Sequence, residues 1–265
     1  EMDRPFVYIA QRHGASGFYA LSIEDPEHPQ VLYRYTVDDP DLHLGSGCVD
    51  IKYAKAGGRY YVILSCEFSQ AGPDSDLGAL IFDVSGLPAA STVRKVAALL
   101  NPDMSGGFHN IFIYKHSDGR VLLFATVSGP FAQVYDLVML VRGASTEEAF
   151  AGRVPNPNDG RSGRGYQDFY VGYHPDTDQD RFYGGGGGGY YVYNVSDLEQ
   201  PELVVTLTGI SGIRSGHTFT PGPSGRYVIA ESEYELAPLR IFDLQPALDG
   251  EASNIRSALS GWTAD

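Results

Sequence analysis

The stretch RFYGGGGGGYYVYNVSD, residues 181–197, decides how the rest of the chain is read. Six consecutive glycines, Gly184 to Gly189, lie between an aromatic cluster and a tyrosine-rich run. A linker would separate two domains, and a phosphate-binding loop would lead into a helix N-terminus. The tract leads instead into YYVYNV, which is typical of a strand. We therefore predict a turn inside a sheet, where absent side chains permit positive φ and close backbone packing.

The residues that follow the glycine tract belong to an internal repeat. In each copy an apolar strand ends in an acidic or amide residue, followed by an aliphatic residue and often by Ser and Pro. The shared position is occupied by Asp83, Asp136, Asn194 and Asp243, at separations of 53, 58 and 49 residues, with Ser22 in a partial first copy. The repeat continues in register through the glycines, which excludes a linker between domains.

A predicted hairpin precedes each of the last four copies. Each hairpin combines a strand, a polar turn with Gly or Asp and an Arg, and a second strand. These hairpins occupy residues 48–66, 109–127, 167–185 and 217–233, whereas the first copy keeps only a second strand at 4–11. Further strands are expected after the closing element at 31–37, 93–99 and 202–209.

Four short strands in a period of about fifty residues are typical of a propeller blade. We predict an all-β fold, a single β-propeller domain over residues 1–265 with four-stranded antiparallel blades. The expected blades are 1–43, 44–100, 105–142, 165–210 and 213–250, with an irregular insertion at 143–165 that contains one short helical turn at 145–150. Our preferred interpretation is that residues outside this chain complete the ring, and the alternative is a closed ring of five blades. The tail offers one strand candidate, 255–262.

The closing element resembles the LVIVD-repeat family of cell-surface and secreted bacterial and archaeal proteins. The resemblance rests on ALIFDVS, YYVYNVSDLEQP, GFYALSIEDPEHP and LRIFDL, and on the strand starts GGFHNIFIY and SGHTFTPGPSGRY. It covers residues 5–244, although the second copy has SGLP in place of SDP and the third lacks both Ser and Pro. It implies a β-propeller of about seven blades and a periplasmic, cell-surface or extracellular location. It implies little about chemistry.

The composition limits the possible partners. The net charge of −14 disfavours nucleic acid, because an acidic surface repels phosphate backbones. A protein partner is expected, and basic patches or metal ions would be attracted. No window of 18 apolar residues predicts a transmembrane segment. We recognise no signal peptide within this chain, and this is compatible with removal of a signal peptide during export.

Cys48 and Cys66 are the only cysteines, and they lie symmetrically about Gly57 in the turn of one hairpin. Residues symmetric about a turn face each other across the ladder. A disulfide is therefore geometrically possible, provided that the register has no bulge, and it would indicate an oxidising compartment. The alternative is a pair of buried free thiols. The absence of a C-x-x-C pair argues against a cysteine zinc site.

The starts of the hairpins align, and the first strand of every blade is expected to line a central channel. The expected channel-lining residues are Asp50, His109, Asn110, Asp168, His217 and Thr218. Imidazole and carboxylate together can bind a transition metal, with His109 and His217 as ligands, and calcium is the other candidate cofactor. The alternative is a polar ring hydrogen-bonded to water and backbone.

The remaining polar groups are expected at the surface. These are His13, His28, His43, His116 and His174, the acidic turn at 175–180, and the strand that carries Glu231, Glu233 and Glu235. For the turn at 175–180 the alternative is a calcium site, and for the three glutamates it is a carboxylate group that holds a cation or a basic partner.

Two functions follow. The first is a non-catalytic scaffold of the cell envelope, or an accessory subunit of a larger assembly. The second is a metal-dependent, oxidase-like enzyme with His109 and His217 in the channel, which rests on analogy of fold.

Overall fold

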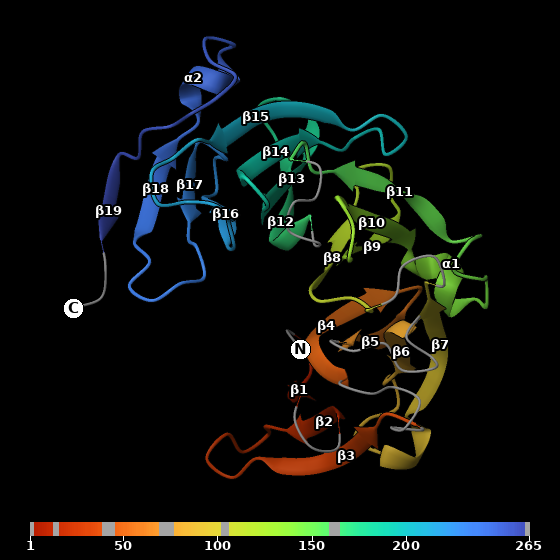
Figure 1. Ribbon diagram of the computed structural model, residues 1–265. Helices are drawn as coiled ribbons and strands as arrows, with labels where there is room; N and C mark the ends of the chain where they lie inside the picture. The colour runs from red at the N-terminus through yellow and green to blue at the C-terminus, as the bar shows by residue number, and fades with distance from the viewer. Residues whose placement is uncertain are drawn as a thin grey trace. The chain divides into compact units, whose positions relative to one another are not determined.

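The computed structural model describes residues 3–12, 16–38, 46–68, 77–101, 106–158 and 165–262, and these residues form an all-β fold of five antiparallel sheets (Figure 1). The first sheet has three strands and the other four have four strands each. Within each sheet the strands are neighbours in sequence order. This meander is the arrangement that the repeat predicts.

The strands follow the repeat closely. The first sheet contains β1 (Phe6–Gln11), β2 (Gly17–Ser22) and β3 (Gln30–Thr36). The second contains β4 (Ser46–Ala56), β5 (Arg59–Phe68), β6 (Leu77–Asp83) and β7 (Arg94–Leu100), preceded by the short 3-10 helix η1 (Ala90–Thr92). The third contains β8 (Ile111–Lys115), β9 (Val121–Thr126), β10 (Phe131–Asp136) and β11 (Phe150–Pro155), with helix α1 (Leu137–Val141) between the last two.

The fourth sheet contains β12 (Tyr166–His174), β13 (Gln179–Gly186), β14 (Gly189–Asn194) and β15 (Glu202–Thr208). The fifth contains β16 (Phe219–Pro221), β17 (Tyr227–Ala230), β18 (Leu239–Asp243) and β19 (Ser260–Trp262), with helix α2 (Gln245–Leu248) before the last strand. Among the described residues, no helix has the length and apolar character needed to cross a bilayer.

The chain divides into two compact units. The first unit comprises residues 1–113 and 136–150, and the second comprises residues 114–135 and 151–265. The boundary passes through the third sheet. A core around Phe18, Phe82, Val62 and Leu64 holds the first two sheets together. In the second unit, Tyr190 and Phe219 pack with their ring centroids 5.0 Å apart in a core shared by the fourth and fifth sheets.

The repeated acidic or amide residue ends the third strand of a sheet in the same way each time. Its side-chain oxygen accepts a hydrogen bond from a backbone N–H two or three residues later, which turns the chain out of the sheet. The bonds run from Ser85 N to Asp83 (3.0 Å), Met139 N to Asp136 (3.0 Å), Ser196 N to Asn194 (3.1 Å) and Gln245 N to Asp243 (2.9 Å). At Asp136 this oxygen caps α1.

The glycine tract forms the β13–β14 hairpin, as predicted. Gly187 and Gly188 make the turn, and Gly188 and Gly189 have φ of +84° and +144°. The remaining glycines lie within strands, where their role is close packing. A Cβ on Gly185 would lie 1.9 Å from the carbonyl oxygen of His217, and one on Gly186 would lie 2.0 Å from that of Gly165.

Consecutive sheets within a unit are joined backbone to backbone. The chain that enters a first strand donates a hydrogen bond to a carbonyl in the last residues of the second strand of the preceding sheet, or just after that strand. These bonds are Phe108 N to Cys66 O (2.9 Å) in the first unit, and Gly165 N to Gly129 O (2.7 Å) and Gly216 N to Gly186 O (2.8 Å) in the second. Glycine is required there because the two backbones touch.

Two details differ from the sequence prediction, and a third extends the fifth sheet beyond its predicted end at residue 250. The segment 143–165 was expected to be irregular, yet β11 lies within it and completes the third sheet. The expected strand face of Glu231, Glu233 and Glu235 is wrong, because β17 ends at Ala230 and these glutamates lie in a loop. The tail strand is found as β19, which pairs with β18 and so belongs to the fifth sheet.

We predict that Gly185→Ala lowers the free energy of unfolding by at least about 1–3 kcal/mol, because the new methyl group meets backbone that cannot rotate away. Chemical denaturation of the purified protein measures this. Gly222→Ala is the matched control, since a Cβ there has its nearest neighbour at 3.5 Å, and it should be nearly neutral. Equal losses in the two variants would contradict the close-packing argument.

Candidate functional site

The first strands of the hairpins carry the polar residues that the sequence singled out. In the first unit, Asp50 follows a β-bulge in β4 and is half-buried. Its carboxylate accepts hydrogen bonds from the backbone N–H of Ile51 (2.8 Å) and of Ile111 (3.0 Å) and pairs with Lys52. Asp50 therefore fastens the second sheet to the start of β8, which is a structural use of a candidate ligand.

His109 lies beside this junction. Its Nδ1 is 2.9 Å from the carboxylate of Glu67, and the two side chains are 20% and 15% exposed. The carbonyl of His109 accepts a hydrogen bond from the Ser65 hydroxyl, which also bonds the Asp50 carbonyl. Asn110 follows His109 and is half-buried. His109 is thus held by an acid on the neighbouring sheet rather than left open as a ligand.

Cys48 and Cys66 face each other in the β4–β5 register, as the sequence predicted. The predicted disulfide is wrong: the two sulfur atoms are 3.3 Å apart and both cysteines are free and buried. A covalent bond would need a separation of about 2.05 Å. The hydrogen bond between Cys66 and Cys48 and the burial of the site raise the pKa of the Cys66 thiol.

We predict that neither thiol reacts with an aromatic disulfide reagent in the native protein at neutral pH, because both thiols are buried and the raised pKa of Cys66 suppresses its thiolate. Both thiols should react once the chain is unfolded without reductant. Absorbance of the released thiolate counts them. A protein that still lacks two reactive thiols after unfolding would contradict the free pair.

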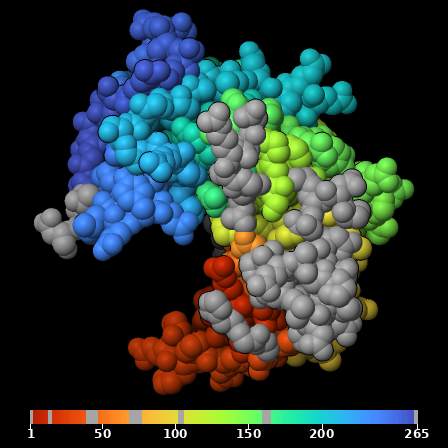
Figure 2. Space-filling view, in the orientation of Figure 1, coloured from red at the N-terminus to blue at the C-terminus, as the bar shows by residue number. Residues whose placement is uncertain are grey.

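In the second unit, His217 lies at the wall of an open cleft of about 620 Å³. The cleft is lined by Gln167 and by two loops, 212–217 and 233–234. The Nε2 atom of His217 is 3.7 Å from Glu233, and its Nδ1 is 3.2 Å from the hydroxyl of Thr218. The chain from β16 onward, in shades of blue, lies at the surface of the face drawn in Figure 2.

Asp168 repeats the arrangement of Asp50. It follows a bulge in β12, and its carboxylate accepts the N–H of the next residue, Phe169, at 2.8 Å. Its neighbour Gln167 is the residue that reaches the cleft. Of the residues at the cleft, His217 was predicted from the alignment of hairpin starts, and Glu233 only as an alternative carboxylate site. The loop residues Arg214 and Tyr234 were not among the predicted site residues.

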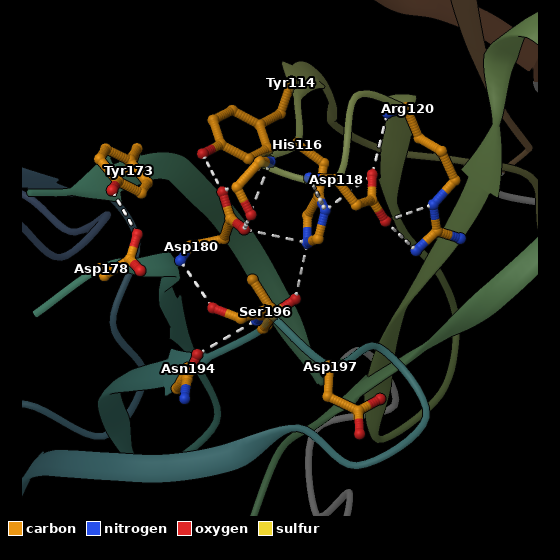
Figure 3. A network of polar contacts seen from close by, with 12 residues as sticks. Tyr114, His116, Asp118, Arg120, Tyr173, Asp178, Asp180, Asn194, Ser196 and Asp197 are labelled. Atoms are coloured by element: carbon orange, nitrogen blue, oxygen red, sulfur yellow. Dashed lines mark hydrogen bonds and ion pairs between the residues drawn. The ribbon is translucent and has the colours of Figure 1, made fainter.

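A buried polar network joins the third and fourth sheets within the second unit (Figure 3). Asp180, at the start of β13, is fully buried and accepts hydrogen bonds from the hydroxyl groups of Tyr114 and Ser117. The Nε2 atom of His116 lies 3.2 Å from this carboxylate and 3.0 Å from the carbonyl of Val195. Every group in this network has a partner, so the network is a structural fastening.

The charged residues beside the network are also paired. Asp118 lies 3.0 Å from Nδ1 of His116 and pairs with Arg120 at 2.6 Å. Partial burial by itself raises the pKa of Asp118, but the hydrogen bonds from Arg120 and His116 outweigh it and lower the pKa to about 2. Burial and the adjacent Asp180 raise the pKa of Tyr114.

Two histidines expected at the surface are buried, which corrects that expectation. His116 and His174 are 2% and 4% exposed, because each turn packs against a neighbouring sheet. His28 is exposed, as expected, and pairs with Asp25 at 2.9 Å. His13 and His43 lie outside the described residues. The alternative of a calcium site at 175–180 gains no support. The Asp180 carboxylate is already hydrogen-bonded within the network, and the Asp178 carboxylate accepts a hydrogen bond from the hydroxyl of Tyr173.

Over the described ranges, no three His, Cys, Asp or Glu side chains gather closely enough to hold a metal ion. His109 and His217 belong to different units, and each is engaged by a glutamate of its own unit. The second-unit cleft offers a cation, an acid, an imidazole and a phenol at an open surface. That mixture suits recognition of a polar segment by hydrogen bonds and charge.

Comparisons with known proteins support the fold. No family model matches the sequence, and no curated protein is detectably similar to it. Sqt1 from Chaetomium thermophilum superimposes with a TM-score of 0.57 at 15% identity, covering 96% of this chain and 56% of that one. Raptor from Chaetomium thermophilum superimposes with a TM-score of 0.57 at 12% identity, and the match covers 99% of this chain and 20% of Raptor. The dihydro-heme d1 dehydrogenase NirN superimposes with a TM-score of 0.53 at 13% identity, and the match covers 98% of this chain and 45% of NirN.

These neighbours show that the fold is of the β-propeller class. The chain spans little more than half of Sqt1 and a fifth of Raptor. Sqt1 and Raptor contain WD40-type propellers, and one Sqt1 structure holds the N-terminus of a ribosomal protein. NirN is an enzyme by its name, so the fold alone does not separate binding from catalysis.

We predict that Asp180→Ala lowers the free energy of unfolding by about 3–5 kcal/mol, because it leaves buried hydroxyl and imidazole groups without their acceptor. Denaturant titration monitored by tyrosine fluorescence measures the loss. Asp197→Asn is the control, since Asp197 is exposed on the turn beside the network, and it should cost less than about 1 kcal/mol. A small effect at Asp180 would overturn the fastening role.

Proposed function

We propose that the chain is a non-catalytic β-propeller scaffold, secreted or held in the cell envelope, that binds a protein partner through the cleft of its second unit. The location rests on the LVIVD-like closing elements, such as YYVYNVSDLEQP. The scaffold role is supported by the fold it shares with Sqt1 and Raptor. The observation that carries the proposal is the loop at 231–238.

This loop presents side chains that bind rather than side chains that pack. Tyr234 and Leu236 are 48% and 69% exposed, although large apolar residues gain free energy by burial. Glu233 and Glu235 flank Tyr234 and are exposed as well. Leu236 has a φ of +58°, a strained conformation for a residue with a side chain. A conformation that costs free energy and exposes apolar surface is typical of a binding loop.

The chemistry of the loop defines the partner. Glutamates beside an exposed tyrosine and leucine suit a basic peptide segment that also carries an apolar anchor. The overall charge of −14 favours the same partner by long-range attraction. Gln167 and the loop 212–217 before β16 line the adjoining cleft and can exchange hydrogen bonds with an extended segment.

The test begins with the partner that copurifies with the tagged full chain from its native source. Glu235→Lys should weaken binding of that partner at least about tenfold and make binding less sensitive to salt. Glu27→Lys is the charge-matched control, because it makes the same charge reversal at an exposed glutamate of the first unit. Biolayer interferometry with the purified pair measures both. Equal weakening by the two variants would mean that net charge, not this loop, governs binding.

The apolar part of the loop has its own test. Tyr234→Ser should cost at least about 1.5 kcal/mol of binding free energy, because a tyrosine at the centre of an interface is a typical hot spot. Tyr227→Ser, an exposed tyrosine on β17, is the matched control. Retention of full affinity in Tyr234→Ser would place the binding surface elsewhere. Fractionation of the native cells tests the location separately.

A further inference from the structure

A second, smaller cleft lies between the fourth and fifth sheets, on the face opposite the buried Asp180 network. It has a volume of about 250 Å³. Its lining comes from β12 and β13 on one side and from the turn after β16 on the other. The lining residues are Tyr170, Gly172, Tyr173, His174, Tyr183, Pro221, Gly222, Pro223 and Gly225.

Two buried nitrogen atoms on this face of the fourth sheet lack a hydrogen bond of normal geometry. One is Nε2 of His174, which lines the cleft and has the backbone of Ser224 nearby, and the other is Nη1 of Arg181, which lies across the strand pair from the lining residue Gly172. Both residues are almost completely buried, at 4% and 2% exposed. Buried polar groups in folded proteins are nearly always bonded, so an unsatisfied pair at a cleft indicates a site for a ligand.

The register places Arg181 on the cleft side of its sheet. Arg181 lies directly opposite Gly172 on β12 and opposite Asn194 on β14. Cross-strand partners share a face of the sheet, and Gly172 lines the cleft without a side chain to cover the guanidinium. The charge of Arg181 also lowers the pKa of His174, although burial lowers it more. Asp180, the preceding residue, points to the opposite face.

The closing position of the fourth sheet offers Arg181 no carboxylate. In the second and fifth sheets, the residue that ends the third strand is an aspartate paired with an arginine of the hairpin. Those pairs are Arg59 with Asp83 and Arg226 with Asp243. The fourth sheet has Asn194 at this position, and an amide cannot neutralise a guanidinium. Arg181 instead donates to neutral side chains, to Thr177 at 3.0 Å and Gln179 at 3.1 Å, and it also contacts the hydroxyl of Tyr183.

We propose that this cleft binds a compact oxyanion, a phosphate or a carboxylate, between Nη1 of Arg181 and Nε2 of His174. A buried cation without a carboxylate is costly, and an anion in the cleft would neutralise it. The Thr177 hydroxyl lies 3.0 Å from Nδ1 of His174. In the tautomer in which Thr177 donates to Nδ1, the proton of a neutral ring is on Nε2, where an anion can accept it. The tyrosine and proline walls keep the site apolar around the charge, which strengthens the contact. This site is independent of the peptide cleft proposed above.

The test is isothermal titration of the purified full chain with inorganic phosphate and, separately, with acetate. The expected result is one saturable site for at least one of the two anions. Tighter binding of phosphate assigns the site to phosphate groups, and tighter binding of acetate assigns it to carboxylates, including those of a protein partner. Absence of saturable binding by both anions would overturn the proposal.

Asn194→Asp is the decisive variant. It keeps the oxygen that accepts the N–H of Ser196, so the turn is retained, and it supplies the missing carboxylate opposite Arg181. Binding of the anion should fall at least about tenfold. His174→Phe should also weaken binding, by removing one donor. Arg256→Gln, at an exposed arginine outside both clefts, should leave it unchanged. An anion that binds Asn194→Asp as well as the native chain, or is lost in Arg256→Gln, lies elsewhere and would refute the assignment.

Discussion

The structure depends on the contact between the backbone entering one sheet and the second strand of the sheet before it. Such a contact requires two main chains to approach until a carbonyl and an N–H meet, which leaves no room for a Cβ. Gly107 in the first unit and Gly185 in the second meet this requirement, with facing carbonyls 2.0 and 1.9 Å from where a Cβ would lie. The glycine content of the sequence thus reflects sheet-to-sheet packing as well as turns.

The same contact determines where polar side chains can be used. Once the backbones are joined, the bulges before Asp50 and Asp168 turn each carboxylate toward the following N–H groups. At Asp50 the carboxylate reaches the next sheet, at the N–H of Ile111. The polar ring that the sequence predicted at the strand starts is, in the first unit, largely bonded within the protein. The open groups lie instead on the loops and between sheets.

Strand order, hairpin register and the closing turn could be predicted because they depend on local patterns. The pairing of Cys48 with Cys66 followed from symmetry about Gly57, and the register is as expected. Whether the sulfurs are bonded or only adjacent does not follow from register. β11 was missed because FAGRVP is neither alternating nor strongly apolar. The burial of His116 could not be predicted, because its acceptors Asp180 and Val195 lie on another sheet, 64 and 79 residues away.

The closing position of the repeat shows how such a fold can acquire different sites without losing its strands. The turn there needs only a side-chain oxygen that accepts an N–H, and Asp and Asn provide it equally well. Asp83 and Asn194 make this bond at 3.0 and 3.1 Å. The charge at the position is therefore free to vary while the turn is kept. Where the charge is present, as at Asp83, the hairpin arginine is neutralised within its own sheet. Where it is absent, as at Asn194, the cation of Arg181 is left for a ligand to neutralise.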